Sequence, residues 1–201
     1  MLSNEQKQEF YEQGYLKIPG AVPPSMVDEA RKAMNYSIGA VGQTGEDAEA
    51  FKVAAYCHEL RGEPLMTDLF NRTGVMDAAE CLIGKGKVLP CENVQMAMRF
   101  PTILDDDVPE PRGHLDGLGN GKNGMAKVDF PHPAVQVTGK AGDAVIAHHQ
   151  MVHTGGPNAS PDIRYAAITR LRHVDCEANG IEVYTDIWRE WDGVRDLGIT
   201  V

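Results

Sequence analysis

The sequence lacks the features typical of membrane proteins, nucleic-acid-binding proteins and disulfide-bonded secreted scaffolds. No run approaches the roughly 18 to 20 apolar residues that a membrane-spanning helix needs. Lys and Arg are dispersed, and 29 acidic residues against 19 basic ones give a formal net charge of −10, which argues against nucleic acids and anionic membranes as partners. The four cysteines show no C-x-x-C spacing and the opening residues are too polar for a secretory signal, so we expect reduced thiols in a cytoplasmic protein.

The length and composition that remain are typical of one globular domain. The chain has 201 residues, of which 42% are hydrophobic and 24% are charged. This length is sufficient to bury a sizeable core and is short for two domains.

Helical patterns occupy the first part of the chain. Ser3 precedes an amphipathic stretch that Gly14 closes, as expected for a capped helix. Further helices are predicted over residues 26–38, with Ser25 as the cap, over 46–60, and over 63–82 with a break near Gly74.

Strand patterns follow after Gly84. Short apolar runs bounded by Gly, Pro, Asn and Asp predict strands over residues 87–89, 93–100, 134–138, 144–149 and 163–174. Helices followed by strands predict an α+β domain with a β-sandwich or barrel core. The tail 180–201, which contains Trp188 and Trp191, is expected to pack back on the sheet.

The first group of residues that points to chemistry is the His-x-Asp of His114 and Asp116. Residues i and i+2 of an extended strand share a face, so this spacing can present an imidazole and a carboxylate to one metal ion. His-x-Asp alone occurs by chance in many proteins, so a second observation is needed.

The second group surrounds His153. The apolar run 144–149 leads to His153 and a Gly-rich turn, and Arg164 follows eleven positions later at the start of the next predicted strand. If these two strands are antiparallel neighbours, His153 and Arg164 point into one cavity. Strand alternation also places His149 on the face of His153, so His149 stays open as an alternative ligand or a site-lining residue.

Two histidines and one carboxylate form the facial triad of non-haem iron oxygenases, and an arginine can bind the far carboxylate of a 2-oxo acid. The order His-x-Asp, His and then Arg resembles the phytanoyl-CoA dioxygenase (PhyH-like) family of Fe(II)/2-oxoglutarate oxygenases. The opening stretch around Phe10 and Gly14–Gly20, and the His-Thr-Gly-Gly-Pro-Asn-Ala-Ser sequence that begins at His153, are also similar to that family.

The resemblance implies a fold, a reaction and a set of site residues. The implied fold is a double-stranded β-helix (jelly roll) in one domain, with a mainly helical flank over 1–83 and the jelly-roll core and tail over 84–201. The implied activity is hydroxylation of a small molecule with O2, coupled to decarboxylation of 2-oxoglutarate to succinate. By position, His114, Asp116 and His153 would bind Fe(II), Arg164 would anchor 2-oxoglutarate, and Gln95 would lie near the cosubstrate.

The interval from His114 to His153 is shorter than in members of the family. It leaves room for two or three strands of ordinary length, with which a complete eight-stranded double sheet is hard to draw. Three explanations stay open: a natural short variant with a trimmed barrel, a sheet completed by a partner subunit as in a homodimer, and loss of a segment near Asn123–Lys127.

Alternatives also stay open for other residues and for the function. Arg99 and Arg112 are predicted either to meet an anionic substrate at the mouth of the site or to be solvated strand ends. A catalytically inactive jelly-roll relative that acts as a binding or scaffold protein would keep the same motifs. A Zn or Mn hydrolase with the same ligands would have no use for Arg164. The sequence does not identify the substrate.

Overall fold

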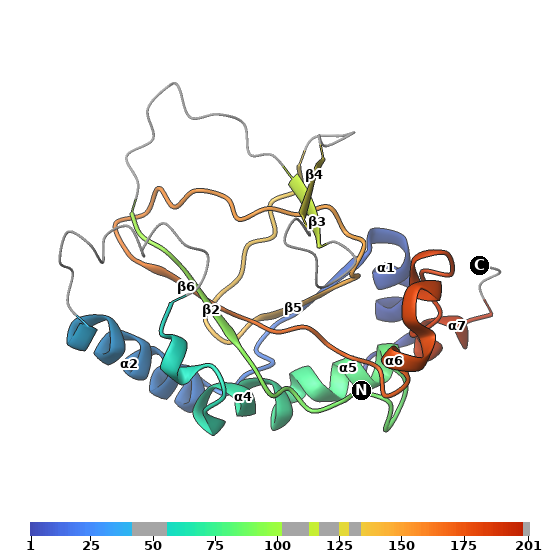
Figure 1. Ribbon diagram of the computed structural model, residues 1–201, viewed down its shortest axis with the longest axis horizontal. Coiled ribbons are helices and arrows are strands. Elements are labelled where there is room, and N and C mark those ends of the chain that lie inside the picture. The colour runs from blue at the N-terminus through green and yellow to red at the C-terminus, as the bar shows by residue number, and fades with distance from the viewer. Residues whose placement is uncertain (42–55, 102–112, 117–124, 129–133, 199–201) are drawn as a thin grey trace.

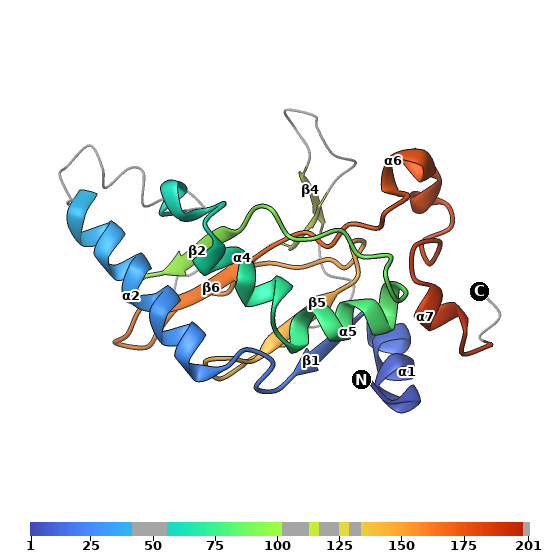
Figure 2. The same cartoon turned by 90° about the horizontal axis from the view of Figure 1, so that it is seen from below.

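The computed structural model describes residues 1–41, 56–101, 113–116, 125–128 and 134–198. Helices α2 (Pro24–Val41), α4 (Pro64–Asn71) and α5 (Gly74–Ile83) follow one another along one side of the molecule, and short strand pairs lie next to them (Figures 1 and 2). The predicted mixture of helices and strands is confirmed.

Local signals account for most helix ends. Helix α1 (Asn4–Gln13) begins with a capping box: the Ser3 hydroxyl accepts from the Gln6 amide, and the Gln6 side-chain oxygen accepts from the Ser3 amide. It ends at Gly14, whose φ of 74° is the left-handed conformation that glycine adopts readily. Thr73 caps α5 by accepting from Val75, so the predicted break near Gly74 is confirmed.

One helix prediction needs a corrected start, and another lies largely outside the described residues. Helix α2 begins at Pro24 rather than at Met26 with Ser25 as the cap, because proline is well suited to the first turn of a helix. Of the predicted helix 46–60, residues 46–55 lie outside the described residues, and the remainder contains a bridge at Tyr56 and the 3₁₀ helix η1 (His58–Leu60). The remaining short helices, α6 (Cys176–Asn179), η2 (Gly180–Tyr184) and α7 (Asp192–Arg195), belong to the tail. No helix in the described part of the chain is both long and apolar enough to cross a membrane.

The described strands form three antiparallel pairs. They are β1 (Tyr15–Ile18) with β5 (Ala144–Ala147), β2 (Gln95–Arg99) with β6 (Arg164–Ile168), and β3 (Gly113–Asp116) with β4 (Met125–Val128). Isolated bridges join Tyr56 to Met96, Val88 to His173 and His114 to His153. Within the described ranges, these pairs are separate sheets and do not close into a barrel.

The strand predictions are partly confirmed. β2, β5 and β6 lie inside predicted runs, but β5 ends at Ala147 because residues 148–151 turn. The strand predicted over 134–138 is wrong: this segment pairs with no described strand, and Val135 and Val137 are exposed. β1 and β4 were not predicted, because each is only four residues long and its strand character comes from its partner.

Two hydrophobic cores support two of the strand pairs, β1–β5 and β2–β6. The first joins α1, α5, β1, β5 and the tail through buried residues that include Phe10, Leu16, Leu82, Ile146, Trp188 and Trp191. The second joins α2, α4 and β2 through buried residues that include Met34, Met66, Leu69, Val94, Met96 and Met98. The tail therefore packs back as predicted, with the Phe10 ring 4.8 Å from that of Trp191. All four cysteines are free thiols.

Candidate metal and anion site

His114 and His153 face each other across an antiparallel bridge. The amide of His114 donates to the carbonyl of His153 over 2.9 Å, and the amide of His153 donates to that of His114 over 3.0 Å. Residues that exchange both bonds are directly opposite and share a face. Their ring centroids lie 4.3 Å apart with 53° between the planes, so the backbone itself brings the two predicted ligands together. Figure 1 shows β3 beside the segment that leads from β5 to β6.

The ring orientation of His153 suits a metal ligand. Its Nδ1 lies 2.9 Å from the carbonyl oxygen of Met151. Because a carbonyl only accepts, Nδ1 carries the proton and the lone pair is on Nε2. A hydrogen bond from one ring nitrogen to a carbonyl is the usual way in which proteins fix the tautomer of a metal-binding histidine.

Asp116 ends β3 two positions after His114, so backbone alternation assigns both to the same face. The side chain of Asp116 and the whole of Arg112 lie outside the described residues. Among the side chains that are described, no three His, Cys, Asp or Glu gather as a metal-binding group. The two histidines fit two positions of a facial triad, and the third position falls where the side chain is not described.

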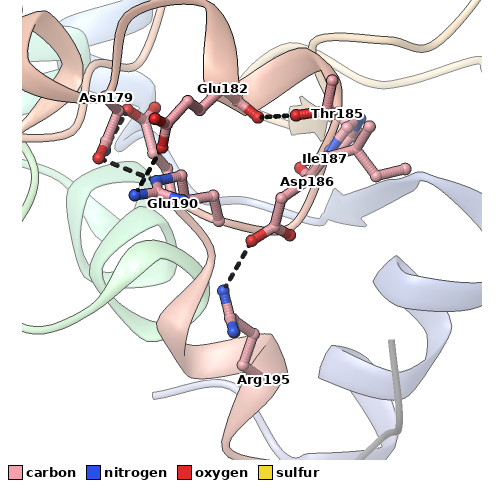
Figure 3. A network of polar contacts seen from close by, with 9 residues as sticks. Asn179, Glu182, Thr185, Asp186, Ile187, Glu190 and Arg195 are labelled. Carbon is pink, nitrogen blue, oxygen red and sulfur yellow. Dashed lines mark hydrogen bonds and ion pairs between the residues drawn. The ribbon is translucent and has the colours of Figure 1, made fainter.

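His148 and His149 are held by the C-terminal tail. His148 is buried, its Nε2 donates to the carbonyl of Ile187 over 2.7 Å, and its Nδ1 accepts from the Gln150 amide over 3.2 Å. Both ring nitrogens are therefore used within the protein. Figure 3 shows the tail network around Ile187, in which Arg195 pairs with Asp186.

His149 contacts the same region. Its ring lies 4.2 Å from that of His148 and meets Tyr184 edge-on at 5.8 Å. Burial lowers its pKa, while a hydrogen bond with the Val183 backbone opposes the shift. The alternation argument that aligned His149 with His153 fails, because β5 has ended and the chain turns between them. His153, and not His149, is the residue that bridges to His114.

Arg164 begins β6, as predicted, but its strand neighbour differs from the prediction. β6 pairs with β2 and not with β5, so the strand that precedes His153 and the strand of Arg164 are not neighbours. Arg164 nevertheless reaches the turn that follows His153, because its Nη2 donates to the carbonyl of Gly156 over 2.8 Å. The two residues are connected through this turn rather than through a shared sheet.

Arg99 and Gln95 lie at the two ends of β2. Arg99 is the direct partner of Arg164 in the β2–β6 pair, and Gln95 is the partner of Ile168. Strand alternation places Gln95 and Arg99 on the same face of this pair.

Sequence reasoning missed Asn158, which holds the turn in place. Asn158 is buried, and its amide donates to the carbonyls of Arg99 over 2.9 Å and of Asp162 over 2.6 Å. Its side-chain oxygen accepts from Ser160. An Asn directly after Gly-Pro is a turn signal, because Asn side chains often bond to nearby backbone, but this signal does not reveal the distant partner Arg99.

Comparison with known proteins agrees with the motif order. The family model described as "Phytanoyl-CoA dioxygenase (PhyH)" matches residues 106–166, which is less than a third of the chain and includes His114, Asp116, His153 and Arg164. Neither the curated proteins nor the solved structures gave a match. Residues 106–166 therefore carry the sequence pattern of the PhyH family of Fe(II)/2-oxoglutarate oxygenases, as the order of the motifs predicted.

Proposed function

We propose that this protein is a 2-oxoglutarate-dependent non-haem iron oxygenase that hydroxylates a small molecule. The observation that carries the proposal is the bridge between His114 and His153, because it sets two imidazoles on one face within the segment that matches the PhyH family. Two histidines with a nearby carboxylate and open coordination positions are the usual ligand set of this class of iron enzyme.

Each proposed site residue has a distinct task. His114, Asp116 and His153 hold Fe(II), and Arg164 binds the distal carboxylate of 2-oxoglutarate with its planar fork. Gln95 lies near the cosubstrate, and Arg99, Arg112 and His149 are the proposed substrate-facing residues. When bound, the iron and 2-oxoglutarate supply the oxidation, with 2-oxoglutarate converted to succinate and CO2 and one oxygen atom of O2 transferred to the substrate. The contribution of the chain is to orient these groups and to exclude water.

The finer architecture is part of the same proposal. The three strand pairs would belong to one shortened jelly roll within a single domain over 1–201, flanked by the N-terminal helices. The dispersed basic residues and the net charge of −10 favour a small-molecule substrate over nucleic acid or a membrane. A cytoplasmic location is part of the same proposal.

The first test is spectroscopic and needs no substrate. Anaerobic protein is titrated with Fe(II) and 2-oxoglutarate, and the visible metal-to-ligand charge-transfer band of the chelate is recorded. We expect the band in the wild type, its loss in His114→Ala and in His153→Ala, and its retention in His58→Ala, which removes an exposed histidine far from the bridge in sequence. Absence of the band in folded wild-type protein that has bound the metal would reject the oxygenase.

An inactive relative is the second candidate. It is favoured by the separate two-stranded sheets of the described residues, which do not form a closed barrel. It predicts weak metal binding and no substrate-independent turnover of 2-oxoglutarate. Succinate release measured with iron, ascorbate and O2 separates the two candidates.

A homodimer that completes the sheets is proposed for the same reason. Short strand pairs with unpaired edges readily add a strand from another chain. Sedimentation equilibrium over a range of protein concentrations tests this, and a monomer at all concentrations would exclude it.

A further inference from the structure

The two arginines at the end of the β2–β6 pair are direct neighbours. Arg99 and Arg164 are Cα partners in the antiparallel register, so their side chains leave the same face of the sheet. The opposite face carries Met96 and Met98, which are fully buried in the second core against the helices. The arginine face is therefore on the other side of the strand pair from the helices of the second core.

Placing two like charges directly opposite each other across a strand pair costs stability. Among the residues that the structure describes, no carboxylate forms an ion pair with either guanidinium. This arrangement is unusual in a chain with a net charge of −10, in which acidic partners are plentiful. Two neighbouring guanidinium groups with no carboxylate partner among the described residues are suited to binding an anion.

Both guanidinium groups meet the same turn immediately after His153. Arg164 donates to the carbonyl of Gly156 over 2.8 Å. The guanidinium of Arg99 lies against Gly155, where a Cβ would come within 2.8 Å of Nη2 and 3.4 Å of Nε. Glycine at position 155 thus provides the space that the head of Arg99 occupies.

The rest of the turn fixes this geometry. Buried Asn158 donates to the carbonyl of Arg99 and so ties the turn to the end of β2. The charge of Arg99 also acts on buried Tyr56, where it opposes the increase in pKa that burial causes. The backbone of Arg99 is therefore fixed to the turn, and its guanidinium lies against Gly155 of the same turn.

We propose that Arg99 and Arg164 form one two-arginine site that binds a single carboxylate group. The identification of that carboxylate as the distal one of 2-oxoglutarate rests on the proposed function. Arg99 is then a second anchor for the cosubstrate, and this role replaces the substrate-facing one given to it above. An ionised carboxylate can accept about four hydrogen bonds, so two guanidinium forks can bind it together. The site therefore selects acids with two acidic ends. One carboxylate binds the two arginines, and the other end, a carboxylate or a keto acid, reaches toward His153.

The test uses glutarate and 2-oxoglutarate on iron-free protein in the presence of a chelator, so that binding does not depend on the metal. Isothermal titration calorimetry compares the wild type with Arg99→Ala, Arg164→Ala and Arg99→Lys. Arg72→Ala is the charge-matched control, because Arg72 is an exposed residue at the end of α4 whose partner is Asp68. We expect each of the two alanine variants to weaken glutarate binding by about tenfold or more, since each removes charge-assisted hydrogen bonds. Arg99→Lys should recover part of the loss, and Arg72→Ala should bind like the wild type.

A steric variant tests Arg99 without removing it. Gly155→Ala places a methyl group against the guanidinium and should weaken glutarate binding as Arg99→Ala does. Gly62→Ala is the control, because its added methyl would meet only the carbonyl oxygen of Glu92, at an ordinary 3.6 Å.

Thermal unfolding at low salt separates anion binding from a purely structural role. Arg99→Ala should keep or raise the melting temperature of the ligand-free protein, because it removes the repulsion between the two arginines. A lower melting temperature combined with unchanged glutarate affinity would overturn the proposal, as would failure of the wild type to bind either acid.

If glutarate binding depends on both arginines but no charge-transfer band forms with iron, the two-arginine site stands and the oxygenase fails. If the band forms and Arg99→Ala leaves it and the affinity unchanged, the oxygenase stands and the two-arginine site fails.

Discussion

The imidazole of His148 donates to the carbonyl of Ile187 over 2.7 Å and thereby ties the end of β5 to the C-terminal tail. The ring also lies 4.6 Å from that of Trp188 and 5.4 Å from that of Trp191, inside the first core. The tail is therefore attached through a titratable residue that is buried. This makes the docking of the tail sensitive to acid.

The first prediction is a loss of stability between pH 6.5 and 4. Burial lowers the pKa of His148 to about 4, and the neighbouring His149 adds to the decrease while the bond to Ile187 opposes it. Unfolding returns the group to its ordinary value of about 6.5, so in this pH range the unfolded state binds a proton that the folded state does not. The free energy of unfolding should therefore fall as the pH falls through this range, by up to about 3 kcal/mol from this residue.

Urea unfolding at several pH values compares the wild type with His148→Phe. The variant keeps an aromatic ring beside the two tryptophans but leaves the Ile187 carbonyl without its donor, which should cost about 1–3 kcal/mol at pH 7.5. Its stability should then vary less than that of the wild type between pH 6.5 and 4. If the free energy of unfolding changes with pH to the same extent in both proteins, His148 is not the residue that causes the loss of stability.

The second prediction concerns Gly193, where α7 packs directly on α5. A Cβ at this position would lie 2.0 Å from the carbonyl oxygen of Cys81 and 3.0 Å from that of Leu82, and these are backbone atoms that cannot rotate away. Gly193→Ala should destabilise the protein by about 3 kcal/mol, at the upper end of the usual cost of overpacking. The measurement is urea unfolding followed by tryptophan fluorescence. Gly39→Ala is the control, because its methyl meets no atom within 4 Å in helix α2 and should leave stability unchanged or slightly increased.

How much of the structure could be predicted depended on whether the signal was local. Ser3 with Gln6 and Gly14 predict the ends of α1, because capping depends on residues within one turn. β1 was not predicted because it is only four residues long and becomes a strand by pairing with β5, which is distant in the sequence. The apolar segment 134–138 shows the converse: it pairs with none of the described strands and does not adopt strand structure, although its residues are apolar.

The candidate site divides in the same way. The motif order named His114, Asp116, His153 and Arg164, and the match to the PhyH family covers all four. The sequence could not show that His114 and His153 bridge directly, since that pairing is fixed by register between distant segments. The proximity of Arg99 to Arg164 was hidden for the same reason, because β6 pairs with β2 instead of with β5.

The third prediction is that Asn158 maintains the turn at the arginine pair. Its buried amide donates to the carbonyls of Arg99 and Asp162, and the Asp162 carbonyl also accepts from the Ser160 hydroxyl. Asn158→Ala removes the Asn158 donor to the Arg99 carbonyl and should destabilise the protein by about 1–3 kcal/mol. It should also weaken glutarate binding, because Arg99 loses its attachment to the turn. Asn4→Ala, at an exposed position in α1, should change stability by less than about 0.5 kcal/mol.

The last prediction separates the oxygenase from a hydrolase with the same metal ligands. Arg164 donates to the carbonyl of Gly156 and is not one of the proposed metal ligands, so Arg164→Ala should leave metal affinity within about a factor of two of the wild type. In an oxygenase, the same variant should weaken 2-oxoglutarate binding by about tenfold or more, because the distal carboxylate loses a charged fork. Metal affinity is measured with Co(II) absorption, and 2-oxoglutarate affinity with the charge-transfer band of the Fe(II) chelate. Arg164→Lys should fall between the wild type and the alanine variant, because lysine keeps the charge and loses the planar fork. If Arg164→Ala binds the metal and 2-oxoglutarate as the wild type does, Arg164 has no role in cosubstrate binding. A hydrolase with the same metal ligands, which does not need Arg164, then explains the data better than an oxygenase.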